Sequence, residues 1–284
     1  MSFAGFRVLS LESRRAPEME AWIRRLGGDP FVAPSVQERA LADHSHAIRF
    51  LYRLEAGDFD MVILMTGVGL ELLREIAAAQ MPVERFAAAL RGVTVVARGP
   101  KPVPILKALQ VRAQVIIPEP NTWKEIVEVV ALRPERRIAV QEYGRPNAAM
   151  NVALERLGAH VDSVQIYRWE LPADPEPLRA AVRRLAAAEC EVILFTSSIQ
   201  LDHLLEVARE MNLETQVLRS LQKDVAVASV GPVMTSSLIA WGIPVDIVPI
   251  HPKMPALVKA AAEAAADVLL RKRRRRLNVF EIAE

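Results

Sequence analysis

The chain has 284 residues, of which 51% are hydrophobic and 25% are charged. This length accommodates two domains of ordinary size, and this composition excludes a disordered or fibrous chain. The net charge of +2 is unevenly distributed, because residues 271–276 are six consecutive basic residues. Without residues 271–284 the body is slightly acidic, which argues against a nucleic-acid-binding surface there. We expect the basic tail to be a solvated helix end, with contact to nucleic acid or anionic lipid as its alternative role.

Export and membrane insertion are not indicated. No apolar run approaches the roughly 20 residues that span a bilayer, and the N-terminus lacks the pattern of a signal peptide. A single cysteine, Cys190, excludes an internal disulfide and suits a reducing compartment. The sequence therefore predicts a cytoplasmic protein with a packed, unreactive thiol.

Short β-branched runs alternate with helical patterns along the whole chain. The predicted strands are, in order, Arg7–Leu9, Met61–Met65, Val93–Ala97, Gln114–Ile117, Arg137–Val140, Val192–Phe195, Val225–Ser229 and Val245–Val248. Thr122 and Glu125 form a capping box at the start of one intervening helix. Alternation of this kind is typical of doubly wound parallel sheets with crossover helices.

One unit of sequence occurs twice, at an offset of about 130 residues. Residues 60–73 align with 191–204, which we interpret as placing Thr66 opposite Thr196. The matches continue between 93–101 and 225–233, between 116–127 and 247–258, and between 7–13 and 137–143. The repeat predicts two similar domains facing a common crevice, since ligands of such sheets bind beyond the carboxyl ends of the strands.

Hydroxyls, glycines and arginines follow the predicted strands. Such strand ends suit carboxylates or phosphates, because glycine permits close backbone approach and arginine binds anions bidentately. The candidate anion-binding residues are Arg14, Thr66, Gly67, Val68, Gly69, Arg98, Gly99, Lys101, Tyr143, Gly144, Arg145, Thr196, Ser197, Ser198, Gly231 and Thr235.

Familiar cofactor and hydrolase motifs are missing from these strand ends. Residues 66–69 do not form the GxGxxG fingerprint of dinucleotide binding, and the chain has no P-loop and no GxSxG elbow. The five histidines are scattered, which argues against a metal site. The residues therefore argue against an NAD site, a P-loop nucleotide site, a serine hydrolase and a metal site.

Five segments, in this order and spacing, carry a family resemblance. They are Thr66-Gly67-Val68-Gly69, Arg98-Gly99-Pro100-Lys101 before Ala108-Leu109, Tyr167-Arg168 before Leu171-Pro172, Phe195-Thr196-Ser197-Ser198, and Val230-Gly231-Pro232 before Trp241-Gly242. Over residues 6–270 the pattern resembles uroporphyrinogen-III synthase. The resemblance implies two flavodoxin-like doubly wound parallel-sheet domains, joined by two strand linkers, with the second domain inserted in the first. Domain one would comprise residues 1–35 and 171–270, domain two residues 36–170, and residues 271–284 would form the basic tail.

The resemblance also implies an activity. Family members close hydroxymethylbilane, a linear tetrapyrrole with eight carboxylates, to uroporphyrinogen III, inverting the last ring and releasing water. This lyase reaction serves heme, siroheme and cobalamin biosynthesis and uses no cofactor; the family route runs through an azafulvene cation and a spiro-pyrrolenine. Because the bilane also closes spontaneously to the uninverted isomer, catalysis is largely positioning. Tyr167 matches the family tyrosine that helps the hydroxyl depart, so it is our catalytic candidate.

Partners and alternatives follow from the same comparison. We expect a monomer whose substrate is handed over from hydroxymethylbilane synthase. Where many members have Thr-Ser, this chain has Thr66-Gly67, and Arg14 lies a few residues later than the family's Thr-Arg. A non-catalytic tetrapyrrole- or anion-sensing two-domain protein is one alternative function, and a sugar-phosphate or nucleotide-processing enzyme is another.

Overall fold

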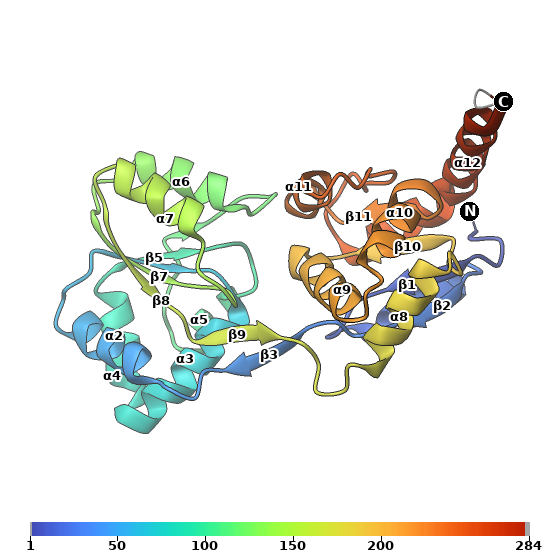
Figure 1. The fold of residues 1–284 in the computed structure, drawn as a ribbon. Coiled ribbons are helices and arrows are strands. Elements are labelled where there is room, and N and C mark those ends of the chain that lie inside the picture. The colour runs from blue at the N-terminus through green and yellow to red at the C-terminus, as the bar shows by residue number, and fades with distance from the viewer. Residues whose placement is uncertain (1, 282–284) are drawn as a thin grey trace. The chain divides into compact units, whose positions relative to one another are not determined.

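The computed structural model describes residues 2–281 and consists of parallel sheets covered by helices (Figure 1). Strands and helices alternate along most of the chain, as predicted. In chain order they are β1 (Arg7–Ser10), α1 (Ala16–Arg25), β2 (Asp29–Val32), β3 (Gln37–Ala40), α2 (Ser45–Glu55), β4 (Met61–Leu64), α3 (Gly67–Gln80), α4 (Val83–Arg91), β5 (Thr94–Ala97), α5 (Val103–Ala108), β6 (Val115–Ile116), α6 (Trp123–Ala131), β7 (Arg137–Gln141), α7 (Ala148–Arg156), β8 (His160–Val164), β9 (Tyr167–Glu170), α8 (Glu176–Ala186), β10 (Val192–Phe195), α9 (Ser198–Glu210), α10 (Glu214–Lys223), β11 (Ala226–Ser229), α11 (Pro232–Ala240) and α12 (Met254–Glu281).

The chain forms two compact units. Unit 1 consists of the residues up to Gln37 and those from Glu170 onward, and unit 2 consists of Glu38–Trp169. Unit 2 is thus inserted in the sequence of unit 1. The strands β3 and β9, at the two crossing points of the chain, pair in a two-stranded sheet of their own. The predicted fold class, with an inserted domain and two strand linkers, is confirmed.

The two main sheets have the same spatial arrangement of strands, but the strand that comes first in the sequence occupies a different place in each sheet. Unit 1 has the order β11-β10-β1-β2 and unit 2 the order β6-β5-β4-β7-β8, with all neighbours parallel. In unit 1 a bridge between Ala228 and Ile247 marks the place of a fifth strand beside β11. Unit 1 therefore follows the flavodoxin-like order, and unit 2 has the same layout with the chain starting at the central strand.

This correspondence confirms the internal repeat. Strands β1, β2, β10 and β11 occupy the places of β7, β8, β4 and β5. One detail of the alignment is wrong. The N-cap residue of α3 is Thr66 and that of α9 is Ser197, so the counterpart of Thr66 is Ser197 and not Thr196. The start of the helix, rather than the identity of the side chain, determines the correspondence.

Each sheet is buried on both faces, which explains its continuous apolar strands. In unit 1, α8 to α11 cover one face, and α1 and α12 cover the other. In unit 2, α2 to α5 cover one face, and α6 and α7 cover the other. The capping box at Thr122 is confirmed at the start of α6, where Glu125 Oε2 accepts from the Thr122 N–H at 2.7 Å.

At the edge where the strands begin, a corresponding arginine–carboxylate ion pair links the two central strands in each unit. Arg7 Nη2 lies 2.7 Å from Glu191 Oε1, and the Arg7 N–H donates to Glu191 Oε2 at 2.8 Å. In unit 2, Arg137 Nη2 lies 2.5 Å from Asp60 Oδ1, and the Arg137 N–H donates to Asp60 Oδ2 at 3.0 Å. The repeat thus extends to the clamp between the two central strands.

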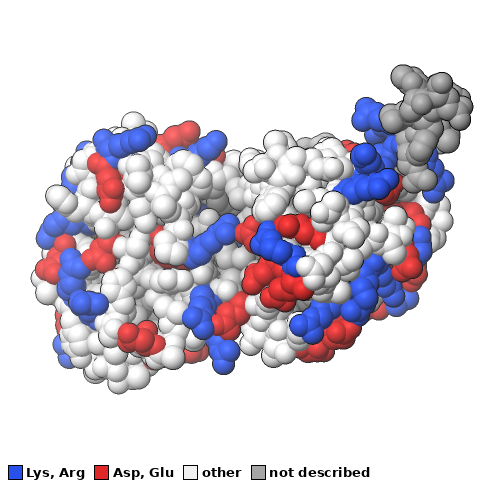
Figure 2. Space-filling model, in the orientation of Figure 1, with Lys and Arg blue, Asp and Glu red and all other residues white. Residues whose placement is uncertain are grey.

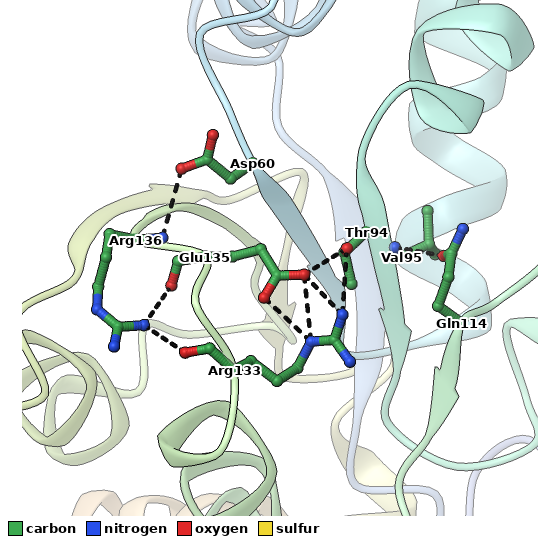
Figure 3. A network of polar contacts seen from close by, with 7 residues as sticks. All are labelled: Asp60, Thr94, Val95, Gln114, Arg133, Glu135 and Arg136. Carbon is green, nitrogen blue, oxygen red and sulfur yellow. Dashed lines mark hydrogen bonds and ion pairs between the residues drawn. The ribbon is translucent and has the colours of Figure 1, made fainter.

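A second polar network lies at this edge of unit 2 (Figure 3). Arg133 Nη2 and Thr94 Oγ1 both donate to Glu135 Oε1 at 2.6 Å. Arg136 Nη1 donates to the carbonyl oxygens of Arg133 and Glu135 at 2.6 and 2.8 Å. These groups satisfy one another at the start of β5 and β7, so this edge serves stability and the opposite edge is available for a site.

Several strands differ from the prediction. Val245–Val248 is not a strand; it forms only the bridge at Ile247, since Pro249 lacks the N–H that would continue the ladder. The strands predicted from β-branched runs omit β3 and β9, which only the resemblance implies as linkers, and also β2 and β8, which are edge strands. Their sequences, Asp29–Val32 with its proline and His160–Val164 with its polar residues, have a weak β pattern.

The expected solvated tail is only partly solvated. Residues 271–281 continue α12, while residues 282–284 lie outside the described residues. Arg271, Arg273, Arg274 and Arg275 are exposed, and Lys and Arg side chains gather at this end of α12 in Figure 2. Lys272 is instead buried, because it forms an ion pair with Asp246 at 2.7 Å. Among the helices that the structure describes, none is long and apolar enough to cross a membrane.

Candidate functional site

The carboxyl ends of the strands in unit 2 bring together most of the predicted residues of that unit. Thr66 is the N-cap of α3, and its Oγ1 accepts from the Gly69 N–H at 3.0 Å. Gly67 lies against the turn that contains Lys101, since a Cβ at position 67 would be 2.8 Å from the Lys101 carbonyl oxygen. Val68 completes the half-buried first turn of α3. The segments after β4 and β5 are therefore in direct contact.

Tyr167 lies against this helix start. Its side chain is buried, and its Oη is 3.3 Å from Thr66 Oγ1, so the two hydroxyls share a hydrogen bond. A buried phenol at a helix N-terminus is a suitable hydrogen-bond donor to a departing hydroxyl.

Arg98 adds a positive charge beside the tyrosines. Its guanidinium carbon lies 4.8 Å from the centroid of the Tyr143 ring, and its Nε is buried without a hydrogen-bond partner. Burial lowers the pKa of Arg98, while the phenols of Tyr143 and Tyr167 partly oppose this effect. Among residues 2–275, whose side chains the structure describes, no acidic side chain forms a salt bridge with Arg98. A desolvated guanidinium of this kind is suited to bind a ligand carboxylate.

An aromatic wall borders the guanidinium. The rings of Tyr143 and Trp169 meet edge to face, with centroids 5.5 Å apart. Gly144 has a φ of +66°, and a Cβ there would lie 2.3 Å from the Trp169 ring. Because glycine alone fits this turn, the ring can approach the backbone. We refer to Thr66, Arg98, Tyr143, Tyr167 and Trp169 as the Tyr167 cluster.

Two other predicted residues of unit 2 lie on the borders of the Tyr167 cluster. Gly99 has a φ of +80° and faces the side chain of Asn121, which a Cβ would approach to 3.0 Å. Arg145 is exposed, and its N–H donates to the Tyr143 carbonyl oxygen at 2.6 Å, which closes the tight turn around Gly144.

The predicted residues of unit 1 lie at the corresponding edge of the other sheet. Ser197 caps α9, and Ser198 begins it. The Thr196 hydroxyl donates to Glu12 Oε2 at 2.6 Å and accepts from Gln200 Nε2 at 2.7 Å, so its hydrogen is already committed to a carboxylate. This leaves the half-buried start of α9, rather than the Thr196 hydroxyl, as the candidate for anion binding in this segment.

The remaining unit 1 candidates are less closely connected. Thr235 Oγ1 donates to Ser229 Oγ at 2.9 Å, and Ser229 Oγ donates to the Gly231 carbonyl oxygen at 3.1 Å, which fixes the start of α11. Arg14 is exposed in the turn between β1 and α1. Its neighbour Ser13 accepts from the N–H groups of Ser35 and Val36, so this turn is held against the first linker.

Sequence reasoning missed four buried polar side chains at these strand ends. They are Glu12, Gln141, Glu142 and Gln200. A signal was present, because the alignment of residues 7–13 with 137–143 places Glu12 opposite Glu142. Each carboxylate accepts from a nearby hydroxyl: Glu12 from Thr196, and Glu142 Oε1 from Ser163 at 2.9 Å. Among the side chains that the structure describes, in residues 2–275, no group of three or more His, Cys, Asp or Glu is arranged to hold a metal ion.

The fold defines a two-domain α/β protein with hydroxyls, glycines and helix starts at the carboxyl ends of its strands. The family model described as "Uroporphyrinogen-III synthase HemD" matches residues 17–259. The chain therefore belongs to the uroporphyrinogen-III synthase family.

The chain is also similar to individual proteins in sequence and in fold. The chain is 26% identical to the uncharacterized protein YjjA of Bacillus subtilis over 263 residues, covering 91% of this chain and 96% of YjjA. A solved mutant uroporphyrinogen III synthase from Thermus thermophilus has a TM-score of 0.70 at 23% identity, covering 93% of this chain and 99% of that one. Uroporphyrinogen-III synthetase from Helicobacter pylori has a TM-score of 0.50 at 13% identity, with 91% and 99% covered. At these identities the structural likeness concerns the fold.

Proposed function

We propose that the chain is an active uroporphyrinogen-III synthase, a lyase that closes hydroxymethylbilane to uroporphyrinogen III. In this reaction the terminal C–O bond breaks as the hydroxyl takes up a proton and leaves as water. The methylene carbon then bonds to the carbon of the last ring that carries the existing bridge, which gives the spiro-pyrrolenine. The existing bridge bond breaks and a new C–C bond forms at the free α-carbon of the last ring, with loss of a proton, so that this ring is inverted. The observation that carries the proposal is the Tyr167 cluster in a member of this family: a buried phenol 3.3 Å from Thr66 Oγ1, beside a buried cation.

Each part of the Tyr167 cluster has a role in this proposal. The phenol of Tyr167 donates a hydrogen bond to the departing hydroxyl, and Thr66 orients the phenol. Arg98 binds a carboxylate of the bilane, and the faces of Tyr143 and Trp169 contact its pyrrole rings. The other candidate residues at the strand ends bind further carboxylates. Since the bilane closes spontaneously to the type I isomer, the residues must mainly restrict its geometry.

The test supplies freshly generated hydroxymethylbilane and separates the oxidised products by isomer. The wild-type protein should enrich type III strongly over the protein-free control. Tyr167→Phe should slow type III formation roughly 100-fold, since one acid–base contact typically contributes 10² to 10⁴. Tyr52→Phe is the matched control, because Tyr52 is exposed on α2 and outside the Tyr167 cluster.

A wild-type product no richer in type III than the protein-free sample would contradict the proposed activity. Binding of the bilane without turnover would instead favour a sensor. The proposal also includes a cytoplasmic monomer that receives its substrate from hydroxymethylbilane synthase. Sedimentation of the purified chain, alone and mixed with that enzyme, tests the last two points.

A further inference from the structure

In each unit, a buried glutamine contacts the start of the helix that follows the central strand, which is α9 in unit 1 and α3 in unit 2. In unit 1 this residue is Gln200, the third residue of α9. Its Oε1 accepts from the N–H groups of Thr196 and Ser197 at 2.8 and 3.3 Å. Its Nε2 donates to the Leu11 carbonyl oxygen at 3.2 Å, at the end of β1. The amide thus ties the helix start to the neighbouring strand.

In unit 2 the amide that bonds the helix start comes from the strand and not from the helix. Gln141, the last residue of β7, is 1% exposed, and its Oε1 accepts from the Thr66 N–H at 3.3 Å. Its Nε2 donates to the Glu142 carbonyl oxygen. The third residue of α3 is Gly69, and a Cβ there would lie 2.0 Å from the Gln141 Nε2 atom. The amide of Gln141 therefore fills the space that a side chain at position 69 would occupy.

The internal repeat shows that the glutamine lies on the helix in unit 1 and on the neighbouring strand in unit 2. Gly69 corresponds to Gln200, and Gln141 corresponds to Leu11, at the offset of about 130 residues. Either the helix or the strand supplies the amide, but both units keep one. In both, its Oε1 accepts from the N–H of the residue that caps the helix, Thr66 or Ser197.

We propose that Gln141 is a positioning residue for the reaction, and that Gly69 is its structural partner. This inference rests on the proposed function. Gln141 fixes the Thr66 backbone, and the Thr66 hydroxyl bonds both the Gly69 N–H and the Tyr167 Oη. The amide of Gln141 therefore acts on the phenol through Thr66. Loss of the amide should lower the rate and the isomer selectivity and leave substrate binding nearly unchanged.

The experiment transplants the unit 1 arrangement into unit 2. The full chain is made as Gln141→Leu, as Gly69→Gln and as the double variant, and each is measured for kcat, KM, type III fraction and thermal midpoint. Gln222→Leu is the matched control, since its exposed amide donates to the Gly242 carbonyl oxygen far from the Tyr167 cluster along the chain.

We expect Gln141→Leu to lower kcat roughly 10-fold with KM changed less than about 2-fold, and to lower the type III fraction. Gly69→Gln alone should lower the thermal midpoint, because its Cβ collides with Gln141. The double variant should recover kcat to within about 3-fold, the type III fraction and the midpoint together, because strongly coupled positions are not additive.

Three results would overturn the inference. They are wild-type kcat in Gln141→Leu, a double variant no better than the single ones, and a double variant that recovers its thermal midpoint but not its kcat and type III fraction. The last result would reduce Gln141 to a structural role. Failure of the proposed function is recognised separately, because the wild-type chain itself would then yield no excess of type III.

Discussion

Lys272 provides a quantitative test of the C-terminal helix. Its Nζ lies 2.7 Å from Asp246 Oδ2, 2.7 Å from the Val225 carbonyl oxygen and 3.4 Å from the Leu221 carbonyl oxygen, so all three donors have acceptors. The side chains of Lys272 and Asp246 are only 9% and 15% exposed. Lys272→Met would therefore leave a mostly buried carboxylate and two carbonyl oxygens without this donor.

Breaking a buried ion pair costs about 3 to 5 kcal/mol. Asp246 keeps its bond from the Val227 N–H at 2.9 Å and some contact with water, so we expect about 2 to 3 kcal/mol for Lys272→Met. The measurement is urea denaturation of the full chain at pH 7, with comparison of the unfolding transition of unit 1. Arg274→Met removes an exposed charge two residues away and should change stability by less than about 0.5 kcal/mol.

The double variant Asp246→Asn with Lys272→Met removes the stranded charge and should recover part of the loss. A Lys272→Met protein as stable as Arg274→Met would refute the reasoning. It would mean that the ammonium group contributes no more than a solvated tail residue does.

Two further predictions concern the two edges of unit 2. Hydrogen bonds from the Arg137 guanidinium, and to a smaller extent from the Arg137 N–H, lower the pKa of Asp60 to about 2. This value is below the pKa of about 4 in the unfolded chain, so the ionised Asp60 stabilises the folded protein above pH 4. This contribution is lost as the pH falls toward 2. Allowing for solvent exposure, Asp60→Asn should remove at most about 1 kcal/mol of acid-dependent stability, measured by urea denaturation between pH 2 and 5, and an unchanged pH profile would contradict this origin. Arg98→Met should raise KM for the bilane roughly 10-fold. Thermal stability should stay the same or rise, since the variant removes a desolvated charge whose buried Nε has no hydrogen-bond partner among the described residues. An unchanged KM would show that Arg98 does not bind the substrate.

The repeat explains why much of the fold could be predicted. Central strands such as β4 and β10 are short, continuous apolar runs, and the helix starts after them carry capping residues that are recognisable locally. The edge strands β2 and β8 were not predicted, because their side chains are less buried and their β pattern is weak. Val245–Val248 has the right composition for a strand but ends at a proline.

The site was predicted as a set of strand ends, but its interactions were not. Glycines, hydroxyls and Arg98 could be assigned to one edge of a sheet, because parallel strands end together. That the Thr196 hydroxyl is committed to Glu12, or that Gln141 reaches Thr66, depends on side chains 184 and 75 residues apart in sequence. Neither pairing has a signature in local composition.

The amino-acid sequence by itself determined the duplication, the parallel α/β class, the capped helix starts and the glycine-rich turns, because these depend on local propensity and on periodicity. Only the tertiary structure decided that Lys272 is buried, that Arg98 is buried beside Tyr143, and that Tyr167 contacts Thr66. The physical reason is that strand order and register bring distant residues together. The free energy of a buried polar group then depends on those neighbours and not on its own position in the sequence.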